Sequence, residues 1–212
     1  MGDERKREGA GISRRTFALG VGGAGALLAL GGLKVVPAEA QVRPPGGQDE
    51  AALLASCIRC ERCVEACPHG ALRPAHLENG IVSVRTPVAN FNDGWCDWCD
   101  EANDGVPLCV AACPTEALKL PADAEAETTI LGKATLIRDW CLAWDKNNGC
   151  KFCYDACPYE AMELDEYGRP LVIADKCNGC GACQSVCVSQ KEGSYAVGAT
   201  SRAIIVVPES EA

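Results

Sequence analysis

Four cysteines lie within 11 residues in the segment Cys57-Ile-Arg-Cys60-Glu-Arg-Cys63-Val-Glu-Ala-Cys67-Pro68. Thiols this close in sequence cannot all pack as hydrophobic side chains, so the segment indicates a set of metal ligands. Its spacing, C-x2-C-x2-C-x3-C-P, is that of bacterial iron–sulfur proteins, in which the fourth cysteine binds the other cluster of a pair.

The pattern recurs three more times with varied spacing. The four quartets are Cys57, Cys60, Cys63 and Cys67; Cys96, Cys99, Cys109 and Cys113; Cys141, Cys150, Cys153 and Cys157; and Cys177, Cys180, Cys183 and Cys187. Together they use all 16 cysteines. Because a [4Fe–4S] cluster takes four cysteines, the count predicts four such clusters with every cysteine both cofactor-binding and metal-ligating.

Zinc and disulfides are the rival interpretations. Zinc usually joins two C-x2-C pairs from distant parts of the chain, and a third cysteine two residues further on would crowd a tetrahedral site. A disulfide framework suits an even cysteine count in an exported chain. However, Cys177, Cys180 and Cys183 would then each have to find a distant partner, so clusters are favoured.

Composition supports a fold that depends on metal. The 212 residues allow one or two domains, but they include only 3 Phe, 4 Trp and 4 Tyr, which leaves little aromatic surface for a core. We therefore expect cluster binding to be inseparable from folding. No Ser/His/Asp order, phosphate-binding glycine loop or dinucleotide motif is present, so we predict an electron carrier, not an enzyme.

The body of the chain is acidic. The net charge is −9, and because residues 1–40 hold six Lys/Arg and four Asp/Glu, the remainder carries 14 basic against 25 acidic residues, or −11. This charge argues against nucleic-acid or anionic-membrane binding. It favours docking to a basic patch on a partner protein, although solubility alone is an equally open explanation.

The N-terminus has the pattern of an export signal. Ser13-Arg14-Arg15-Thr16-Phe17 is a twin-arginine motif, an apolar stretch follows over 17–36, and Ala38-Glu39-Ala40 is typical of a cleavage site. We predict a signal peptide over 1–40, cleaved after Ala40, and a periplasmic protein exported already folded around its clusters. A retained membrane anchor is the alternative, disfavoured by six glycines and Lys34.

Three quartets end in a similar phrase, Cys-Pro-x-x-Ala followed by Leu or Met, which is an internal repeat. The proline fixes the backbone where the chain leaves the cluster and turns into a strand. Val188 replaces it after Cys187, so we expect a different exit path there. Short strands are predicted over 81–84, 134–137, 171–173 and 203–207, and a helix over 51–55 covering the first cluster.

Such strand–ligand–helix units resemble the bacterial two-cluster ferredoxin fold. We therefore predict an α+β protein of two tandem modules, over 51–125 and 126–212, after a flexible leader over 41–50. With neighbouring quartets paired and the fourth cysteines exchanged, the ligand sets are Cys57, Cys60, Cys63 and Cys113; Cys96, Cys99, Cys109 and Cys67; Cys141, Cys150, Cys153 and Cys187; and Cys177, Cys180, Cys183 and Cys157. Nested pairing, first with fourth and second with third, stays open and resembles iron–sulfur subunits of molybdenum oxidoreductases.

Other residues near the ligands are predicted to have supporting roles. Trp95, Trp98, Trp140 and Trp144 lie within a few residues of a ligand, and we expect them to shield the clusters from water. Because 16 cysteines already suffice, His69 and His76 are predicted to be surface residues.

The twin-arginine leader, the quartet spacings and the final Cys177-Asn-Gly-Cys180-Gly-Ala-Cys183-Gln-Ser-Val-Cys187-Val188 together resemble the NapG/MauM family of exported ferredoxin-type proteins. The resemblance implies a periplasmic electron carrier beside a polytopic membrane quinol dehydrogenase of the NapH type, through which it would associate with the membrane. It further implies a downstream periplasmic redox enzyme, such as nitrate reductase, or a cytochrome. A maturation factor, as in methylamine utilisation, and a molybdoenzyme subunit are the alternatives.

Overall fold

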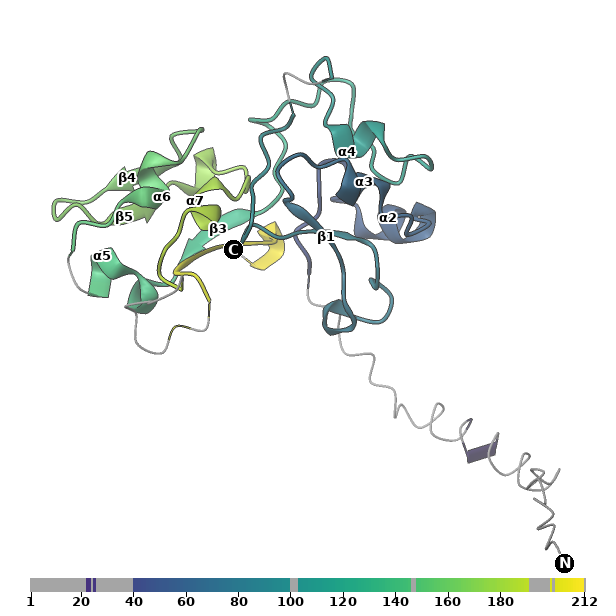
Figure 1. The fold of residues 1–212 in the computed structure, drawn as a ribbon, viewed down its shortest axis with the longest axis horizontal. Helices are drawn as coiled ribbons and strands as arrows, with labels where there is room; N and C mark the ends of the chain where they lie inside the picture. The colour runs from purple at the N-terminus through teal and green to yellow at the C-terminus, as the bar shows by residue number, and fades with distance from the viewer. Residues whose placement is uncertain are drawn as a thin grey trace, which may run out of the picture. The chain divides into compact units, whose positions relative to one another are not determined.

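The computed structural model describes residues 22, 23, 25, 40–99, 103–145, 148–190, 199 and 201–211. The chain divides into two compact units, residues 1–37 and 38–212. The predicted signal peptide therefore lies almost wholly outside the described residues. Within the second unit we call residues 40–125 the N-terminal half and residues 126–211 the C-terminal half (Figure 1).

The helices are short. The α-helices are α2 (Glu50–Ser56), α3 (Arg62–Glu65), α4 (Leu108–Ala111), α5 (Leu142–Asp145), α6 (Phe152–Asp155) and α7 (Ala182–Ser185), and 3-10 turns cover Leu77–Asn79, Arg138–Trp140, Ala174–Lys176 and Glu209–Glu211. The predicted helix over 51–55 corresponds to α2. Its N-cap, Asp49, accepts a hydrogen bond from the Ala52 backbone N–H at 3.0 Å. In the described part of the chain, no helix has the length and apolar character to cross a bilayer.

In the residues that the structure describes, six short strands form three antiparallel pairs. They are β1 (Leu72–Pro74), β2 (Pro87–Ala89), β3 (Lys133–Leu136), β4 (Met162–Leu164), β5 (Pro170–Val172) and β6 (Ile204–Val207). β1 pairs with β2, β4 with β5, and β3 with β6, which comes from the C-terminal end of the described chain. Strands β3, β5 and β6 lie where the sequence predicts them, and β1 and β4 follow the Cys-Pro phrases as expected.

The strand predicted over 81–84 is wrong. These residues form turns, and Ile81 and Val82 are exposed. The hydrogen bonds to the β1 side of the hairpin instead include Thr86, whose carbonyl accepts from the Ala75 N–H at 2.8 Å, and they continue into β2. An apolar run forms a strand only where its apolar face can be buried. Ile81 and Val82 face solvent and only the polar Ser83 of this turn is buried, whereas Thr86, Pro87 and Val88 are buried together.

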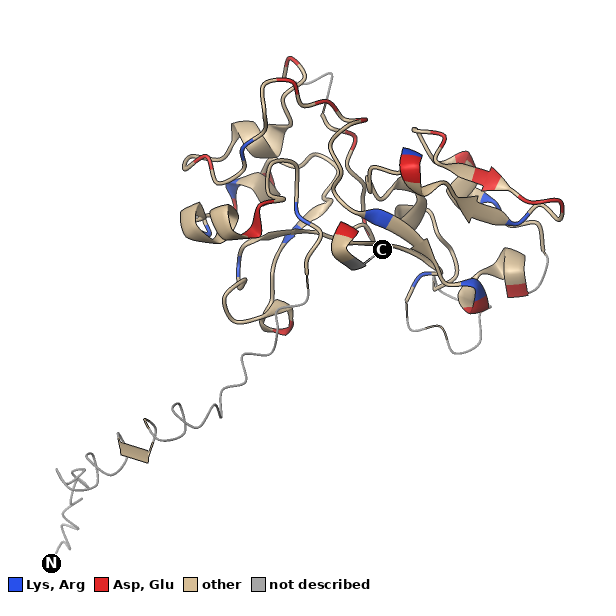
Figure 2. Cartoon of the chain, turned by 180° about the vertical axis from the view of Figure 1, so that it is seen from behind, with Lys and Arg blue, Asp and Glu red and all other residues tan. Residues whose placement is uncertain are grey.

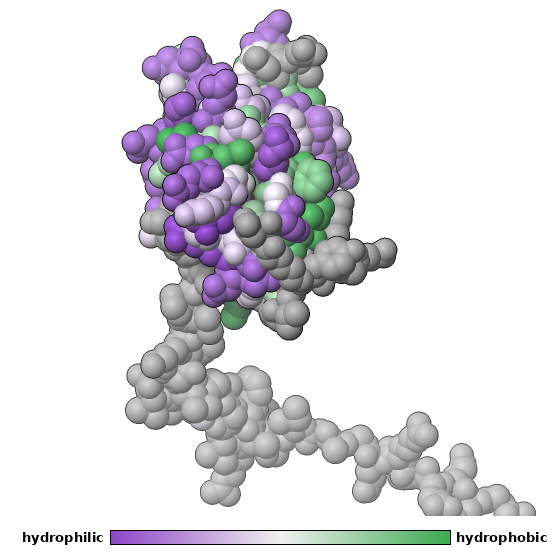
Figure 3. Space-filling model, turned by 90° about the vertical axis from the view of Figure 1, so that its left-hand side faces the viewer, coloured by the Kyte–Doolittle hydropathy of each residue, from purple (hydrophilic) through white to green (hydrophobic). Residues whose placement is uncertain are grey.

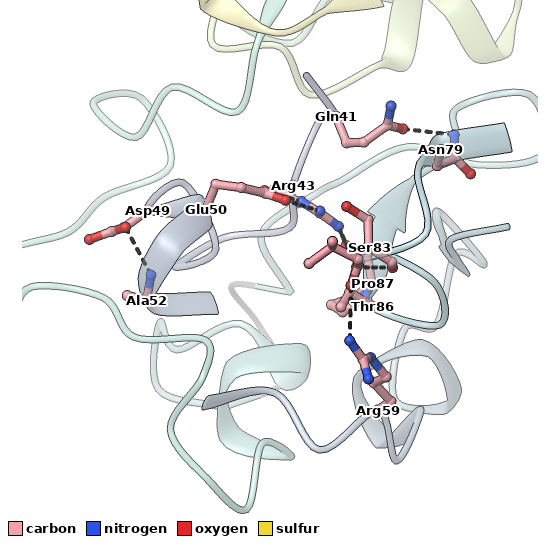
Figure 4. A network of polar contacts seen from close by, with 11 residues as sticks. Gln41, Arg43, Asp49, Glu50, Ala52, Arg59, Asn79, Ser83, Thr86 and Pro87 are labelled. Atoms are coloured by element: carbon pink, nitrogen blue, oxygen red, sulfur yellow. Dashed lines mark hydrogen bonds and ion pairs between the residues drawn. The ribbon is translucent and has the colours of Figure 1, made fainter. Parts of the chain in front are cut away.

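The segment 41–50 is packed, in contrast to the flexible leader that the sequence suggests. Val42, Pro44 and Pro45 are buried, and the Val42 carbonyl accepts from the Ala89 N–H at 2.8 Å. Arg43 is also buried; it donates to Thr86 Oγ1 at 2.9 Å and pairs with Glu50 (Figure 4). A charge taken out of water needs such partners, and they join this segment to the N-terminal half.

The fold is α+β, with small elements around cores that contain the cysteines. One core combines Leu53, Leu72 and Leu118 with Cys109, and another combines Met162 and Ile204 with three cysteines. Acidic residues spread over the loops of both halves and over the β4–β5 hairpin (Figure 2). Seen from one side, the surface is mostly hydrophilic with small hydrophobic areas (Figure 3).

Candidate metal centres

Among the cavities in the described chain, four are each lined by four cysteines. Site I has Cys57, Cys60, Cys63 and Cys113; site II has Cys67, Cys96, Cys99 and Cys109; site III has Cys141, Cys150, Cys153 and Cys187; and site IV has Cys157, Cys177, Cys180 and Cys183. The space between the protein atoms at these sites, open solvent included, is about 390, 410, 340 and 320 Å³. The structure thus brings neighbouring quartets together, with their fourth cysteines exchanged, and does not place the quartets in the nested arrangement.

A repeated local structure produces this exchange. The third cysteine of each quartet lies in a four-residue helix: Cys63 in α3, Cys109 in α4, Cys153 in α6 and Cys183 in α7. The helix ends two residues before the fourth cysteine, and after Cys67 and Cys157 the chain turns into β1 and β4. Because the helix stops there, the fourth thiol leaves the cavity of its own quartet and enters the neighbouring one.

Apolar side chains complete each cavity. Leu53 and Leu118 line site I, Phe91 and Leu131 line site II, Leu142 and Ile204 line site III, and Ala134 and Val206 line site IV. The helix expected over 51–55 beside the first cluster is α2, and its Leu53 lines site I. Phe91 and Ile204 cannot be recognised as site residues from the sequence, because an apolar side chain carries no signal of a site.

Burial disfavours free thiolates in these cavities. It is the main cause that raises the pKa of Cys63 to about 11, of Cys96 to about 12, of Cys153 to about 12 and of Cys180 to about 11. Nearby thiols add to the effect through charge repulsion. A thiol binds metal as a thiolate, so its proton must leave to solvent or another base. The positive charge of iron in a cluster would then stabilise the buried thiolate.

Backbone amides point at several sulfur atoms. The N–H groups of Arg59, Ala161 and Ala134 donate to the Sγ atoms of Cys57, Cys157 and Cys177 at 3.4, 3.3 and 3.4 Å. At Cys113 burial would raise the pKa, but hydrogen bonds from the backbone of Leu118 and Thr115 outweigh it and lower the pKa. Such N–H···S bonds favour negative charge on sulfur and help to set the reduction potential of a bound cluster.

The donor sets fit clusters better than the rival groups. All 16 cysteines are free thiols in the structure. Among the described residues, no three His, Cys, Asp or Glu side chains surround a position for a single metal ion. The thiols of each set instead line one shared cavity, the arrangement that a multi-iron group requires.

The tryptophans lie beside the sites, as the sequence analysis expects. Trp95 lines site II, and Trp98 is buried with its Nε1–H donating to the Gly105 carbonyl at 3.0 Å. Trp140 and Trp144 pack against the core that contains Cys141 and Cys150. Trp95 therefore borders site II directly, whereas Trp98, Trp140 and Trp144 line none of sites I–IV, and their shielding of the clusters stays a prediction.

The two histidines are exposed, as predicted. His69 Nε2 lies 2.6 Å from Asp97 Oδ2, and its ring stacks on Trp95. Neither histidine lines any of the four sites.

Comparison with known families assigns the class. Residues 56–118 and residues 148–191 each match a 4Fe-4S dicluster domain. Two such domains and 16 cysteines correspond to four [4Fe–4S] clusters. The protein is therefore a ferredoxin-type electron-transfer protein.

Its relatives then define the family. Ferredoxin-type protein NapG of Escherichia coli K12 is 35% identical over 189 residues, 79% of this chain and 78% of NapG. Methylamine utilization ferredoxin-type protein MauM of Methylorubrum extorquens is 36% identical over 158 residues, 69% of this chain and 68% of MauM. Electron transport protein HydN of Escherichia coli K12 is 46% identical over 67 residues, 29% of this chain and 37% of HydN. The chain belongs to the NapG/MauM family of ferredoxin-type proteins.

Proposed function

We propose that sites I–IV each hold one [4Fe–4S] cluster through the four cysteines that line them, and that the protein carries electrons through these sites in two tandem modules. When bound, such a cluster takes up and releases one electron at a time. The cysteines hold the clusters, and side chains such as Leu53, Trp95 and Ile204 exclude water. The observation that carries the proposal is the agreement between four cysteine quartets and four cysteine-lined cavities.

We place this carrier in the periplasm, exported by the twin-arginine route, with the signal cleaved after Ala40. An oxidising compartment would convert bare thiols to disulfides, so export after cluster insertion suits a protein with 16 cysteines. We assign it an upstream membrane partner of the NapH type that oxidises quinol, and a downstream periplasmic reductase such as nitrate reductase. The match to NapG, over 79% of the chain, supports this route, and the acidic body suits docking to basic partner surfaces.

A second candidate is an accessory ferredoxin for the maturation of a periplasmic redox enzyme. The 36% identity to MauM, which is named for methylamine utilization, favours it. Neighbouring genes discriminate the two: a membrane ferredoxin and a nitrate reductase support the first function, and a methylamine dehydrogenase cluster supports the second. Copurification of a large catalytic subunit would instead indicate a stable molybdoenzyme complex.

The proposal is tested by iron and sulfide quantification together with EPR on the anaerobically purified protein. We expect about 16 iron and about 16 sulfide per chain, and reduced [4Fe–4S] signals from all four sites. A colourless or zinc-loaded protein, or one with about eight iron and no loss during purification, would contradict it.

A further inference from the structure

The ligand loops of sites II and IV touch, although they belong to different halves of the chain. The backbone N–H of Cys96, from site II, donates to the carbonyl of Cys180, from site IV, at 2.8 Å. An apolar cluster crosses the same contact, since Phe91 and Leu131 pack with Cys67, Cys96 and Val206. Sites I and II share one core in the N-terminal half, and sites III and IV share another in the C-terminal half.

Two glycines in the Cys177–Cys183 loop permit close packing on this side of site IV. A Cβ atom at Gly181 would overlap the ring of Phe91, and one at Gly179 would overlap the backbone of Gly132. Phe91 is only 3% exposed and Gly132 is also buried, so neither neighbour can move away into solvent.

The first quartet shows that the loop backbone alone does not require these glycines. It has the same spacing, and its equivalent residues, Arg59 and Glu61, have φ of 57° and 63°. Gly179 and Gly181 have φ of 78° and 82°, in the same left-handed region. The repeat therefore tolerates side chains at both positions. What distinguishes Gly181 is the ring of Phe91, from the N-terminal half, which packs against it.

A polar contact holds α7, which carries Cys183, to the same region. The guanidinium of Arg202 donates to the Asn92 carbonyl at 2.6 Å and also to the Gln184 carbonyl. Gln184 in turn donates to Asn92 Oδ1 at 3.4 Å. Asn92 follows Phe91 in the chain, so the apolar and polar contacts fix the same junction.

We infer that electrons cross between the two halves at the contact of the Cys96 and Cys180 loops, and that Gly181 is a positioning residue for this transfer. The order along the protein is then I–II–IV–III, which differs from the order of the quartets in the chain. One electron leaves the reduced inner site and the oxidised inner site receives it; no bond forms or breaks and no proton moves. Sites I and III become the ends that exchange electrons with partner proteins. The inference rests on the proposed function.

The test compares EPR spectra of anaerobically purified, dithionite-reduced proteins. In the wild type we expect spin–spin coupling across all four sites. In Gly181→Ala the added methyl group pushes Phe91 away from the loop, and the coupling between the two pairs of sites should become weaker while the coupling within each pair is kept. The matched control is Gly168→Ala, at a position with φ of 74° but open space around it, which should keep the wild-type coupling.

Arg202→Ala provides a second variant that leaves the ligand loop unaltered, and it should weaken the same coupling even if Gly181→Ala fails to fold. Wild-type coupling in these variants at full iron content would overturn the inference and leave the proposed function intact. A low iron content in the wild type would instead contradict the proposed function. The two failures are therefore distinguishable.

Discussion

At the scale of residues, the pairing of ligands between quartets has a direct test in double variants. Cys57 and Cys113 both line site I, so the double variant Cys57→Ser, Cys113→Ser removes ligands of a single cluster. It should lose no more iron than either single variant, about four iron atoms per chain. Cys57→Ser with Cys67→Ser removes a ligand from each of two clusters and should lose about eight. Iron quantification and EPR of the reduced proteins measure both losses.

A nested arrangement gives a different result, because Cys57 would then share a cluster with Cys187. The double variant Cys57→Ser, Cys187→Ser would then lose one cluster, whereas sites I and III predict the loss of two. The sequence predicts the four cysteines that line each site when neighbouring quartets are paired, because three of them lie in one run or close to it and the motif places the fourth in another quartet. It leaves the nested pairing open, and the fold is what distinguishes the two. Arg43 is similar: nothing in its local sequence reveals that Glu50, Thr86 and Pro87 accept its hydrogen bonds.

At the scale of elements, strand β6 closes the C-terminal half over site III. Ile204 is 1% exposed, lines site III and packs in the core with Cys153 and Cys183. Ile204→Ala should destabilise the protein by about 2–5 kcal/mol through the cavity that it leaves. It should also speed the loss of iron in air. Both effects are measured by following cluster absorbance, against denaturant concentration in one experiment and against time in air in the other.

The matched control is Ile81→Ala, the same substitution at a side chain that is 76% exposed, with an expected effect within about 0.5 kcal/mol. Equal effects of the two variants would contradict the role assigned to β6.

The two isoleucines also show why the sequence predicts some strands correctly and one wrongly. Both isoleucines lie in short apolar runs, but only Ile204 has a partner strand, β3, which pairs with β6 from about 70 residues earlier in the chain.

At the scale of the whole molecule, stability depends on filled sites. The apolar cores contain the cysteines themselves, and four cysteines line each of sites I–IV. With the sites unfilled, these side chains lose the group around which they pack, and the half-buried and buried thiols lose their metal partner.

Removing iron with an oxidant and a chelator should therefore unfold residues 40–211. We expect the far-UV circular dichroism to lose its native form and amide hydrogen exchange to become fast throughout, because the raised thiol pKa values leave neutral cysteines facing empty cavities and no large aromatic core replaces the metal. Adding iron and sulfide under reducing conditions should restore both signals. The control is chelator without oxidant, which leaves the iron in place. If the metal-free protein, with its thiols reduced again after the treatment, kept slow exchange and a cooperative thermal transition, the polypeptide would pack without its clusters and the expectation would be contradicted.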